Sequence, residues 1–248
     1  MDKILLVTGA SRGIGAATSV LAARQGWSVV VNFNARGDEA QALVQRIVDE
    51  GGRAMALQAD VSQETQVMAM FDQIDRQWGR LSGLVNNAGV VDVAARLDQM
   101  SWQRWRRMFD VNVLGSLLCA REAVRRMSTR GGGAGGAIVN VSSAAARLGS
   151  PAQYLDYAAA KGAVDTMTVG LAKEVAAEGI RVNAVRPGLI ETDIHASGGQ
   201  PDRVRDLAHQ VPMLRGGQAQ EVAQAIVWLL SEEASYITMA LIDVSGGR

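Results

Sequence analysis

Short apolar runs alternate with longer amphipathic segments along the whole chain. The short runs are apolar on both sides of the backbone, as is typical of strands that helices cover on both faces. They predict strands at Ile4–Thr8, Ser28–Phe33, Arg53–Gln58, Gly83–Asn86, Ala137–Val141, Arg181–Arg186 and Leu241–Asp243. Between them, apolar residues recur three and four positions apart, which predicts helices near 14–25, 38–50, 64–78, 101–129, 154–178 and 219–230.

This alternation predicts an α/β fold. Strand–helix–strand units in succession build a parallel sheet. A chain of 248 residues is long enough to bury a sizeable core without disulfides or metals. No linker or shift of composition divides the chain, so we expect residues 1–248 to form one domain with a doubly wound, seven-stranded parallel sheet and helices on both faces.

Two segments stand outside the alternating pattern. The glycine-rich run 131–136 predicts a flexible surface connection. The polar, glycine-bearing segment Glu191–Gly217 follows a strand end, where ligands of open α/β sheets bind. It predicts a substrate lid near residues 190–217.

Composition and charge exclude several classes of partner. The 25 basic and 25 acidic side chains cancel, so no long-range field favours nucleic acid or anionic lipid. The apolar stretches fall far short of the roughly 20 residues that span a bilayer. We therefore expect neither a nucleic-acid nor a membrane partner, and we take Arg104, Arg106 and Arg107 as a solvated helix face beside packed tryptophans.

The few cysteines and histidines bear on metal binding and on the expected location of the protein. Cys119 is the single cysteine and lies in an apolar stretch, so we expect a small buried hydrophobe. His195 and His209 have no cysteine or carboxylate company, which argues against a metal site, and we expect His195 to be a solvated lid residue. The start Met1-Asp2-Lys3 lacks a secretion signal, so the expected location is the cytoplasm.

A glycine-rich turn follows the first predicted strand. Thr8-Gly9-Ala10-Ser11-Arg12-Gly13-Ile14-Gly15 leads directly into a helical pattern. Glycines permit the tight turn and let backbone amides at the helix N-terminus meet a pyrophosphate. The spacing differs from the commoner G-x-G-x-x-G, but its place in the first strand–helix unit predicts a dinucleotide site. Its candidate residues are Gly9, Ser11, Arg12, Gly13, Ile14 and Gly15.

The end of the second predicted strand bears on cofactor choice. It reads Asn32-Phe33-Asn34-Ala35-Arg36, and no carboxylate follows until Asp38. A carboxylate here typically binds the ribose hydroxyl of NAD, whereas arginine binds the 2′-phosphate of NADP. Asn34, Arg12 and Arg36 therefore favour NADP(H), with NAD(H) as the alternative.

A tyrosine and a lysine lie one helical turn apart at Tyr157 and Lys161. A neighbouring ammonium favours the phenolate, so we expect the pKa of Tyr157 to fall from about 10 toward neutrality. Such a tyrosine can exchange a proton with a carbonyl or alcohol oxygen. Ser142 and Ser143 end a predicted strand nearby. Ser143 is the candidate for bonding the reacting oxygen, whereas for Ser142 a purely structural role at the strand end is the alternative.

These motifs resemble those of the short-chain dehydrogenase/reductase family, in its single-domain Tyr-x-x-x-Lys form. The resemblance rests on Thr8-Gly9-x-x-x-Gly13-x-Gly15, Asn86-Asn87-Ala88-Gly89, Ser143 and Tyr157-x-x-x-Lys161, and it extends to Asp60-Val61, Asn112, Pro187-Gly188 and Ser245-Gly246-Gly247. It covers essentially the whole chain. One departure is Thr238-Met239, where many relatives have Thr-Gly before the last strand.

The resemblance implies a Rossmann-type sheet and a catalytic tetrad of Asn112, Ser143, Tyr157 and Lys161. In it Asn112 supports a water relay, Ser143 holds the substrate oxygen, Tyr157 transfers the proton, and Lys161 tunes the tyrosine and binds the nicotinamide ribose. It also implies cofactor contacts from Asp60, Val61, Asn87, Ala88, Gly89, Pro187, Gly188, Ile190 and Thr192, in addition to Tyr157 and Lys161, and a homotetramer.

The function that follows is hydride transfer between NADP(H) and a secondary alcohol or its ketone, a small molecule that the sequence does not identify. Two alternatives remain open at this point. One is a regulatory protein that senses NADP(H) without turnover. The other is an epimerase or dehydratase on the same fold, which the short chain disfavours.

Overall fold

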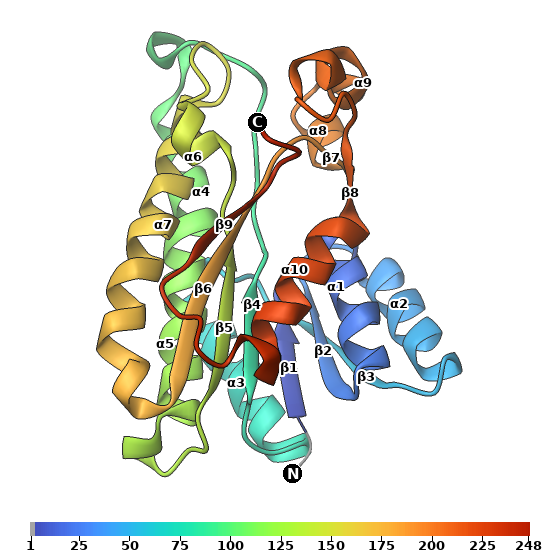
Figure 1. Ribbon diagram of the computed structural model, residues 1–248, viewed down its shortest axis with the longest axis vertical. Helices are drawn as coiled ribbons and strands as arrows, with labels where there is room; N and C mark the ends of the chain where they lie inside the picture. Colours follow the sequence, from blue (N-terminus) through green and yellow to red (C-terminus); the bar gives the residue numbers. More distant parts are fainter. Residues whose placement is uncertain (1–2) are drawn as a thin grey trace.

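Seven parallel strands form the centre of the computed structural model, which describes residues 3–248 (Figure 1). They lie in the order β3-β2-β1-β4-β5-β6-β9. Their bounds are β1 Lys3–Val7, β2 Trp27–Phe33, β3 Arg53–Gln58, β4 Gly83–Asn86, β5 Gly136–Val141, β6 Ile180–Pro187 and β9 Leu241–Val244. The predicted strands and fold class are confirmed. The order reverses between β1 and β4, and such a reversal opens a crevice at the carboxyl ends of the strands.

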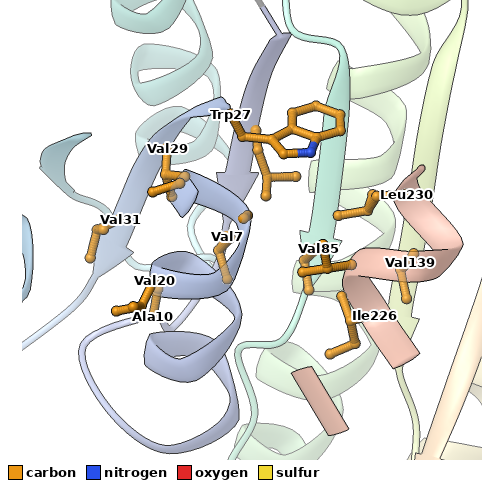
Figure 2. Packing of buried hydrophobic residues seen from close by; sticks show 14 of the residues in the cluster. Val7, Ala10, Val20, Trp27, Val29, Val31, Val85, Val139, Ile226 and Leu230 are labelled. Carbon is orange, nitrogen blue, oxygen red and sulfur yellow. The ribbon is translucent and has the colours of Figure 1, made fainter. Parts of the chain in front are cut away.

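Helices cover both faces of the sheet. α1 (Gly13–Arg24), α2 (Gly37–Asp49) and α10 (Ala219–Leu230) pack on one face, and α3 (Glu64–Gln77), α5 (Gly115–Met127) and α7 (Leu155–Val175) pack on the other. Strand residues alternate between the two cores: Val7 faces the first and Leu6 the second. Figure 2 shows the first core, where Val20 of α1 and Ile226 of α10 meet the strand valines.

The helix predicted near 101–129 is confirmed over Trp102–Met127, but a π-helical turn divides it into three elements. α4 (Trp102–Phe109) ends in a π-helical turn at Asp110–Leu114, and α5 continues from Gly115. The wider turn contains the buried Asn112. Hydrophobic periodicity does not reveal such a turn, because a single π-helical turn is shorter than the window over which the period is read.

The glycine run at 131–136 packs tightly against its neighbours, contrary to the expected flexible connection. A Cβ at Gly133 would lie 2.3 Å from the carbonyl oxygen of Met127, and one at Gly136 would lie 2.4 Å from that of Ser82. Gly135 donates its N–H to Met127 and Gly136 donates to Gly179. The glycines therefore allow close backbone approach between α5 and β5.

Met239 takes a left-handed backbone conformation, with φ of +67°. Its N–H donates to the carbonyl of Val182 at 2.7 Å, which holds the approach to β9 against β6. The tight backbone approach therefore exists at this position even though glycine is replaced by methionine. A side chain in this conformation costs about 1–2 kcal/mol.

Short elements gather at the carboxyl end of the sheet (Figure 1). β7 (Ile190–Glu191) pairs with β8 (Gly217–Gln218), and α8 (Ile194–Ser197) and α9 (Arg203–Leu207) lie between them in sequence. α6 (Ala145–Leu148) follows β5. Single 3₁₀ turns occur at Leu97–Gln99, Thr129–Gly131, Ala176–Glu178, Ala208–Gln210 and Glu232–Ala234.

Two expectations drawn from the sequence concern a secretion signal and a membrane-spanning helix. Met1 and Asp2, on which the expected lack of a secretion signal depends, lie outside the described residues. From Lys3 onward, none of the helices has the length and apolar character needed to cross a membrane.

Candidate active site

The glycine-rich turn adopts a conformation that few side chains could tolerate. Gly9 and Gly13 have φ of +59° and +57°. A Cβ on Gly9 would lie 2.8 Å from the Cα of Ala88 in the loop after β4. The turn therefore needs glycine both for its backbone angles and for this close approach.

Helix α1 begins directly at this turn. No side chain caps it, and its first turn carries no acidic residue. The first N–H groups of a helix lack partners within it and bind anions, with the helix dipole favouring negative charge. This cradle fits the pyrophosphate of a dinucleotide.

Gly15 has a packing role beneath the turn. A Cβ there would lie 2.6 Å from Nδ2 of Asn87. Asn87 donates from that atom to the carbonyls of Thr8 at 2.8 Å and Gly9 at 3.0 Å, which joins the loops after β1 and β4. Gly15 therefore supports the cradle from below, and it is not among the residues that line the cleft.

A long cleft runs from the glycine-rich turn across the ends of β2, β3 and β4. Its walls hold most of the residues predicted to bind the cofactor: Gly9, Ser11, Arg12, Gly13, Ile14, Asn34, Arg36, Asp60, Val61, Asn87, Ala88, Gly89 and Thr192. Trp102, Gln103, Arg106 and Arg107 of α4 also line it. These four were missed because only the tertiary fold brings α4 to the end of β3.

The two arginines at the end of the cleft have ion-pair partners. Arg36 pairs with Glu39 at 2.9 Å, and both side chains are about half exposed. Arg12 pairs with Asp193 of the lid segment at 3.3 Å and also donates to Ser197. Arg36 stands at the end of β2 next to Asn34, whereas Arg12 is tied to the lid.

A second cavity adjoins the cleft and contains Ser143, Tyr157 and Lys161. The two share Ile14, Asn87, Gly89, Thr192 and Ile194 as walls. Pro187, Gly188 and Ile190, which the resemblance placed at the nicotinamide, line this second cavity. Residues from the loops after β4 and β5, from α7 and from the segment after β6 thus meet at one place, although 105 positions separate Asn87 from Thr192 in the chain.

The expected lowering of the Tyr157 pKa is not found. Burial raises the pKa of Tyr157 to about 12, and a hydrogen bond with Ser143 offsets only part of the rise. Nζ of Lys161 lies 5.6 Å from the centre of the Tyr157 ring and donates to the carbonyl of Val141 at 2.7 Å. The helical spacing brings the two residues together, but the fold aims the ammonium at the end of β5.

Lys161 itself is 4% exposed, and burial lowers its pKa from 10.5 to about 8 while the carboxylate of Asp165 opposes the shift. Desolvation disfavours the charged form of an amine. The cation is therefore held in a low-dielectric site, where its interaction with any nearby anion is strong.

The two serines after β5 have different surroundings. Ser142 is 2% exposed and donates to the carbonyl of Lys161 at 3.2 Å. Oγ of Ser143 accepts from the N–H of Ala145 and bonds the Tyr157 side chain. This geometry agrees with the preference for Ser143 as the chemical residue and for a structural role of Ser142.

Asn112 is fully buried and does not line either cavity. Its side chain accepts from the N–H of Val90 at 3.2 Å and donates to the Val90 carbonyl at 3.0 Å. It therefore fixes the loop after β4. A Cβ on Gly89 would lie 2.7 Å from Oδ1 of Asn112 and 3.6 Å from Nζ of Lys161. A residue with a side chain would therefore not fit between the amide of Asn112 and the amine of Lys161.

A buried ion pair lies directly beneath the tyrosine. Arg104 donates to both carboxylate oxygens of Asp156, at 2.7 and 3.0 Å, and to the carbonyl of Val93 at 2.5 Å. Oδ1 of Asp156 also accepts from the N–H of Tyr157 at 3.0 Å. The prediction that Arg104 lies on a solvated face was wrong, and the neighbouring Trp102, expected to pack, is 63% exposed.

The lid segment forms the outer wall of the second cavity. His195 is half-buried here, contrary to expectation, and its Nε2 donates to the carbonyl of Ile190 at 3.0 Å because a carbonyl can only accept. Burial lowers the pKa of His195 below 6.5. Tyr154 and Arg203 also line the cavity, and no local sequence signal marked Tyr154.

Comparison with known proteins gives matches over almost the whole chain. A family model described as enoyl-(acyl carrier protein) reductase matches residues 9–248. An uncharacterized oxidoreductase of Escherichia coli, YgfF, is 56% identical over 99% of both chains. The glucose 1-dehydrogenase 2 of Bacillus subtilis is 36% identical over 99% of this chain and 94% of its own. The 3-oxoacyl-[acyl-carrier-protein] reductase of Staphylococcus aureus is 37% identical over 100% of this chain and 98% of its own.

These matches agree with the parallel sheet and with the motifs at its carboxyl end. The identities lie above 30% over nearly complete chains, and the family model covers both the glycine-rich turn and the Tyr157–Lys161 helix. The protein belongs to the short-chain dehydrogenase/reductase family and is an oxidoreductase of that type.

Proposed function

We propose that this protein transfers hydride between NADP(H) and a secondary alcohol or its ketone, with Tyr157 exchanging the proton. The observation that carries the proposal is the junction of two cavities: one fits a dinucleotide, and the other holds Ser143, Tyr157 and Lys161. The relatives named above support the reaction class, since their names denote dehydrogenation or reduction. No feature favours a sensor, an epimerase or a dehydratase.

The bound nicotinamide would supply or accept the hydride. In ketone reduction, Ser143 donates a hydrogen bond to the carbonyl oxygen, and Tyr157 gives its proton to that oxygen as negative charge develops. A phenol with a pKa of about 12 is protonated at neutral pH and is therefore ready to act as the acid. In alcohol oxidation, Tyr157 must act as the phenolate that takes the proton, and the Lys161 cation, 5.6 Å from the ring centre, is the group proposed to stabilise this phenolate when substrate and cofactor are bound.

Asn112 has a supporting place in this scheme. Its hydrogen bonds to Val90 fix the loop that carries Gly89, and its Oδ1 lies on the Lys161 side of that glycine. A water held between Asn112 and Lys161 would return protons to the tyrosine. The roles of all four tetrad residues form part of the proposal.

Arg36 is the proposed determinant of the preference for NADP(H). It lines the dinucleotide cleft at the end of β2 next to Asn34, and its exposed pairing with Glu39 contributes little stability. One carboxylate oxygen of Asp60, Oδ1, accepts from the N–H of Ser62 at 2.9 Å and from the hydroxyl of Ser62 at 2.7 Å. Arginine at this place suits a 2′-phosphate.

The segment 190–217 is the proposed substrate lid of a protein that acts as one domain over residues 1–248. Its ion pair from Asp193 to Arg12 joins it to the glycine-rich turn, so cofactor and substrate sites share a wall. Assembly as a homotetramer in the cytoplasm is also part of the proposal. The apolar Phe109, Leu114 and Leu117 are 39–48% exposed along α4 and α5 and offer a surface for it.

The test measures cofactor binding and turnover separately. Fluorescence titration with NADPH and NADH gives the two Kd values, and absorbance follows NADPH oxidation with a panel of ketones. We expect tighter NADPH binding and an activity that Tyr157→Phe abolishes while this variant still binds NADPH. Turnover that survives in Tyr157→Phe would remove the tyrosine from the mechanism.

Arg36→Gln tests the cofactor preference. Loss of a charge-assisted hydrogen bond costs about 1.5–3 kcal/mol, so NADPH affinity should fall by about 10- to 100-fold while NADH affinity is unchanged. Arg46→Gln is the matched control, because Arg46 lies on α2, the helix that Arg36 directly precedes, and pairs with Glu50 outside the cleft. Tighter binding of NADH by the unmodified protein would refute the preference.

A further inference from the structure

The substrate cavity is positively charged on the lid side. It is lined by Arg203 and Arg248 in addition to Lys161, and no aspartate or glutamate is among its lining residues. The whole chain has zero net charge, so this imbalance is a local property of the cavity. His195 adds no charge at neutral pH, because burial lowers its pKa.

Arg203 differs from the other two arginines of the lid. Arg205 is exposed and pairs with Asp202 and Asp206, and Arg215 is exposed and pairs with Glu221. Within residues 3–248, the partners of Arg203 are the neutral side chains of Gln200 and Gln153 and the ring of Tyr154, whose centre lies 5.1 Å from the guanidinium.

The guanidinium of Arg203 carries an uncompensated charge. Burial lowers its pKa, Tyr154 opposes this shift, and the nearby Arg248 lowers the pKa further. Tyr154 cannot supply the missing negative charge, because burial raises the pKa of its phenol above 10. A partly buried cation without an acidic partner is costly for the protein, and an anionic ligand would remove that cost.

The position of Arg203 is fixed for such a ligand. Gln153 and Tyr154 precede the helix that carries Tyr157, and both contact the guanidinium. The hydroxyl of Tyr154 donates to Gln200 at 2.9 Å, so the lid and the start of α7 are joined around the arginine. Two guanidinium nitrogens bond glutamines, and the remaining N–H donors can bind a carboxylate.

Beside these basic groups and several neutral polar side chains, the wall has an apolar part. Val91, Leu148, Leu189 and Ile194 line the cavity between the lid and the tyrosine. We propose that the substrate is an oxo or hydroxy acid, whose free carboxylate binds Arg203 while an apolar body places the reacting carbon at Tyr157. This inference rests on the proposed function for the position of the reacting group.

The test measures binding, so it does not depend on turnover. Benzoate and benzamide have the same shape and differ in charge. Each compound is titrated calorimetrically into the 248-residue protein in low-chloride buffer, with and without saturating NADP⁺. The bound NADP⁺ excludes benzoate from the anion-binding N-terminus of α1, so the remaining binding reports on the substrate cavity. We expect benzoate to bind about 10- to 100-fold more tightly than benzamide, as one charge-assisted contact gives.

Variants assign the preference to a residue. Arg203→Gln should remove the preference for benzoate and leave benzamide affinity unchanged, and Arg203→Lys should retain part of it. Arg205→Gln, two positions away on the same helix, should behave like the unmodified protein. A purely structural role of Arg203 would instead weaken both ligands equally.

Several outcomes would overturn the proposal. They are equal affinity for benzoate and benzamide, no measurable benzoate binding, or a preference that survives in Arg203→Gln. Tighter binding of phenyl phosphate than of benzoate would overturn the carboxylate assignment in favour of a phosphorylated substrate. A failure of hydride transfer with normal benzoate selectivity would count against the proposed function alone.

Discussion

Removing one half of the Arg104–Asp156 pair should destabilise the protein strongly. The two side chains are 9% and 1% exposed and share two hydrogen bonds. The change Asp156→Asn leaves the guanidinium buried without a counter-charge. Breaking a buried pair in this way costs about 3–5 kcal/mol.

This cost should be visible in thermal unfolding. For a chain of 248 residues each kcal/mol shifts Tm by about 2–4 °C, so we expect a fall of about 6–20 °C by calorimetry. Asp98→Asn is the matched control, because Asp98 pairs with Arg96 at a surface where the side chains are 68% and 71% exposed. That pair contributes less than about 1 kcal/mol.

A double variant separates the pair from its two members. Arg104→Met combined with Asp156→Leu removes both charges, and we expect it to recover much of the stability lost in either single variant. Because Asp156 also accepts from the N–H of Tyr157, the single variants should lower kcat more than they raise the Kd of the cofactor. A loss in Asp156→Asn no larger than in Asp98→Asn would refute the reasoning.

Three further changes test individual groups. The buried cation of Lys161, with its pKa lowered from 10.5 to about 8, destabilises the fold below pH 8 and ceases to do so as it deprotonates. The stability of Lys161→Met relative to the unmodified protein, measured by urea unfolding, should therefore fall by up to about 3 kcal/mol between pH 8 and 10.5, and a constant difference would contradict this. Cys119, fully buried with its pKa raised to about 12, should react with an aromatic disulfide reagent only as fast as the protein unfolds; complete labelling of the native protein within seconds would disprove it. Met239→Gly should raise stability by up to about 1 kcal/mol by relieving the left-handed conformation, whereas Met213→Gly, at an ordinary φ, should lower it; a Tm decrease in both would refute the strain.

The sequence was sufficient for the elements and for the cofactor turn. Apolar runs predict the seven strands to within one or two residues, because burial of the sheet on both faces favours apolar side chains at most strand positions. The glycines at 9 and 13 identify the turn, since their backbone angles and close approach exclude other residues. Tyr157 and Lys161 are neighbours by helical spacing alone.

Electrostatic environments were not predictable in the same way. Spacing suggested that Lys161 lowers the pKa of Tyr157, but the amine donates to Val141 and burial has the larger effect on the phenol. Arg104 appeared to be one of three surface arginines, and only the packing of α4 against α7 shows its buried partner Asp156. A pKa depends on desolvation and on groups from several elements, which no local pattern contains.

The sequence by itself determined the succession of secondary-structure elements along the chain. It showed which segments are strands, which are helices, and where the glycine-rich turn and the tyrosine–lysine pair lie among them. Local sterics and side-chain periodicity act over a few residues, so they can be read directly. The tertiary structure alone decided which of the lid arginines faces the substrate cavity. Arg205 and Arg215 pair with acidic residues within six positions of themselves. Arg203 lines the cavity with no acidic partner among the described residues, because the place of the lid over the sheet depends on contacts between distant segments.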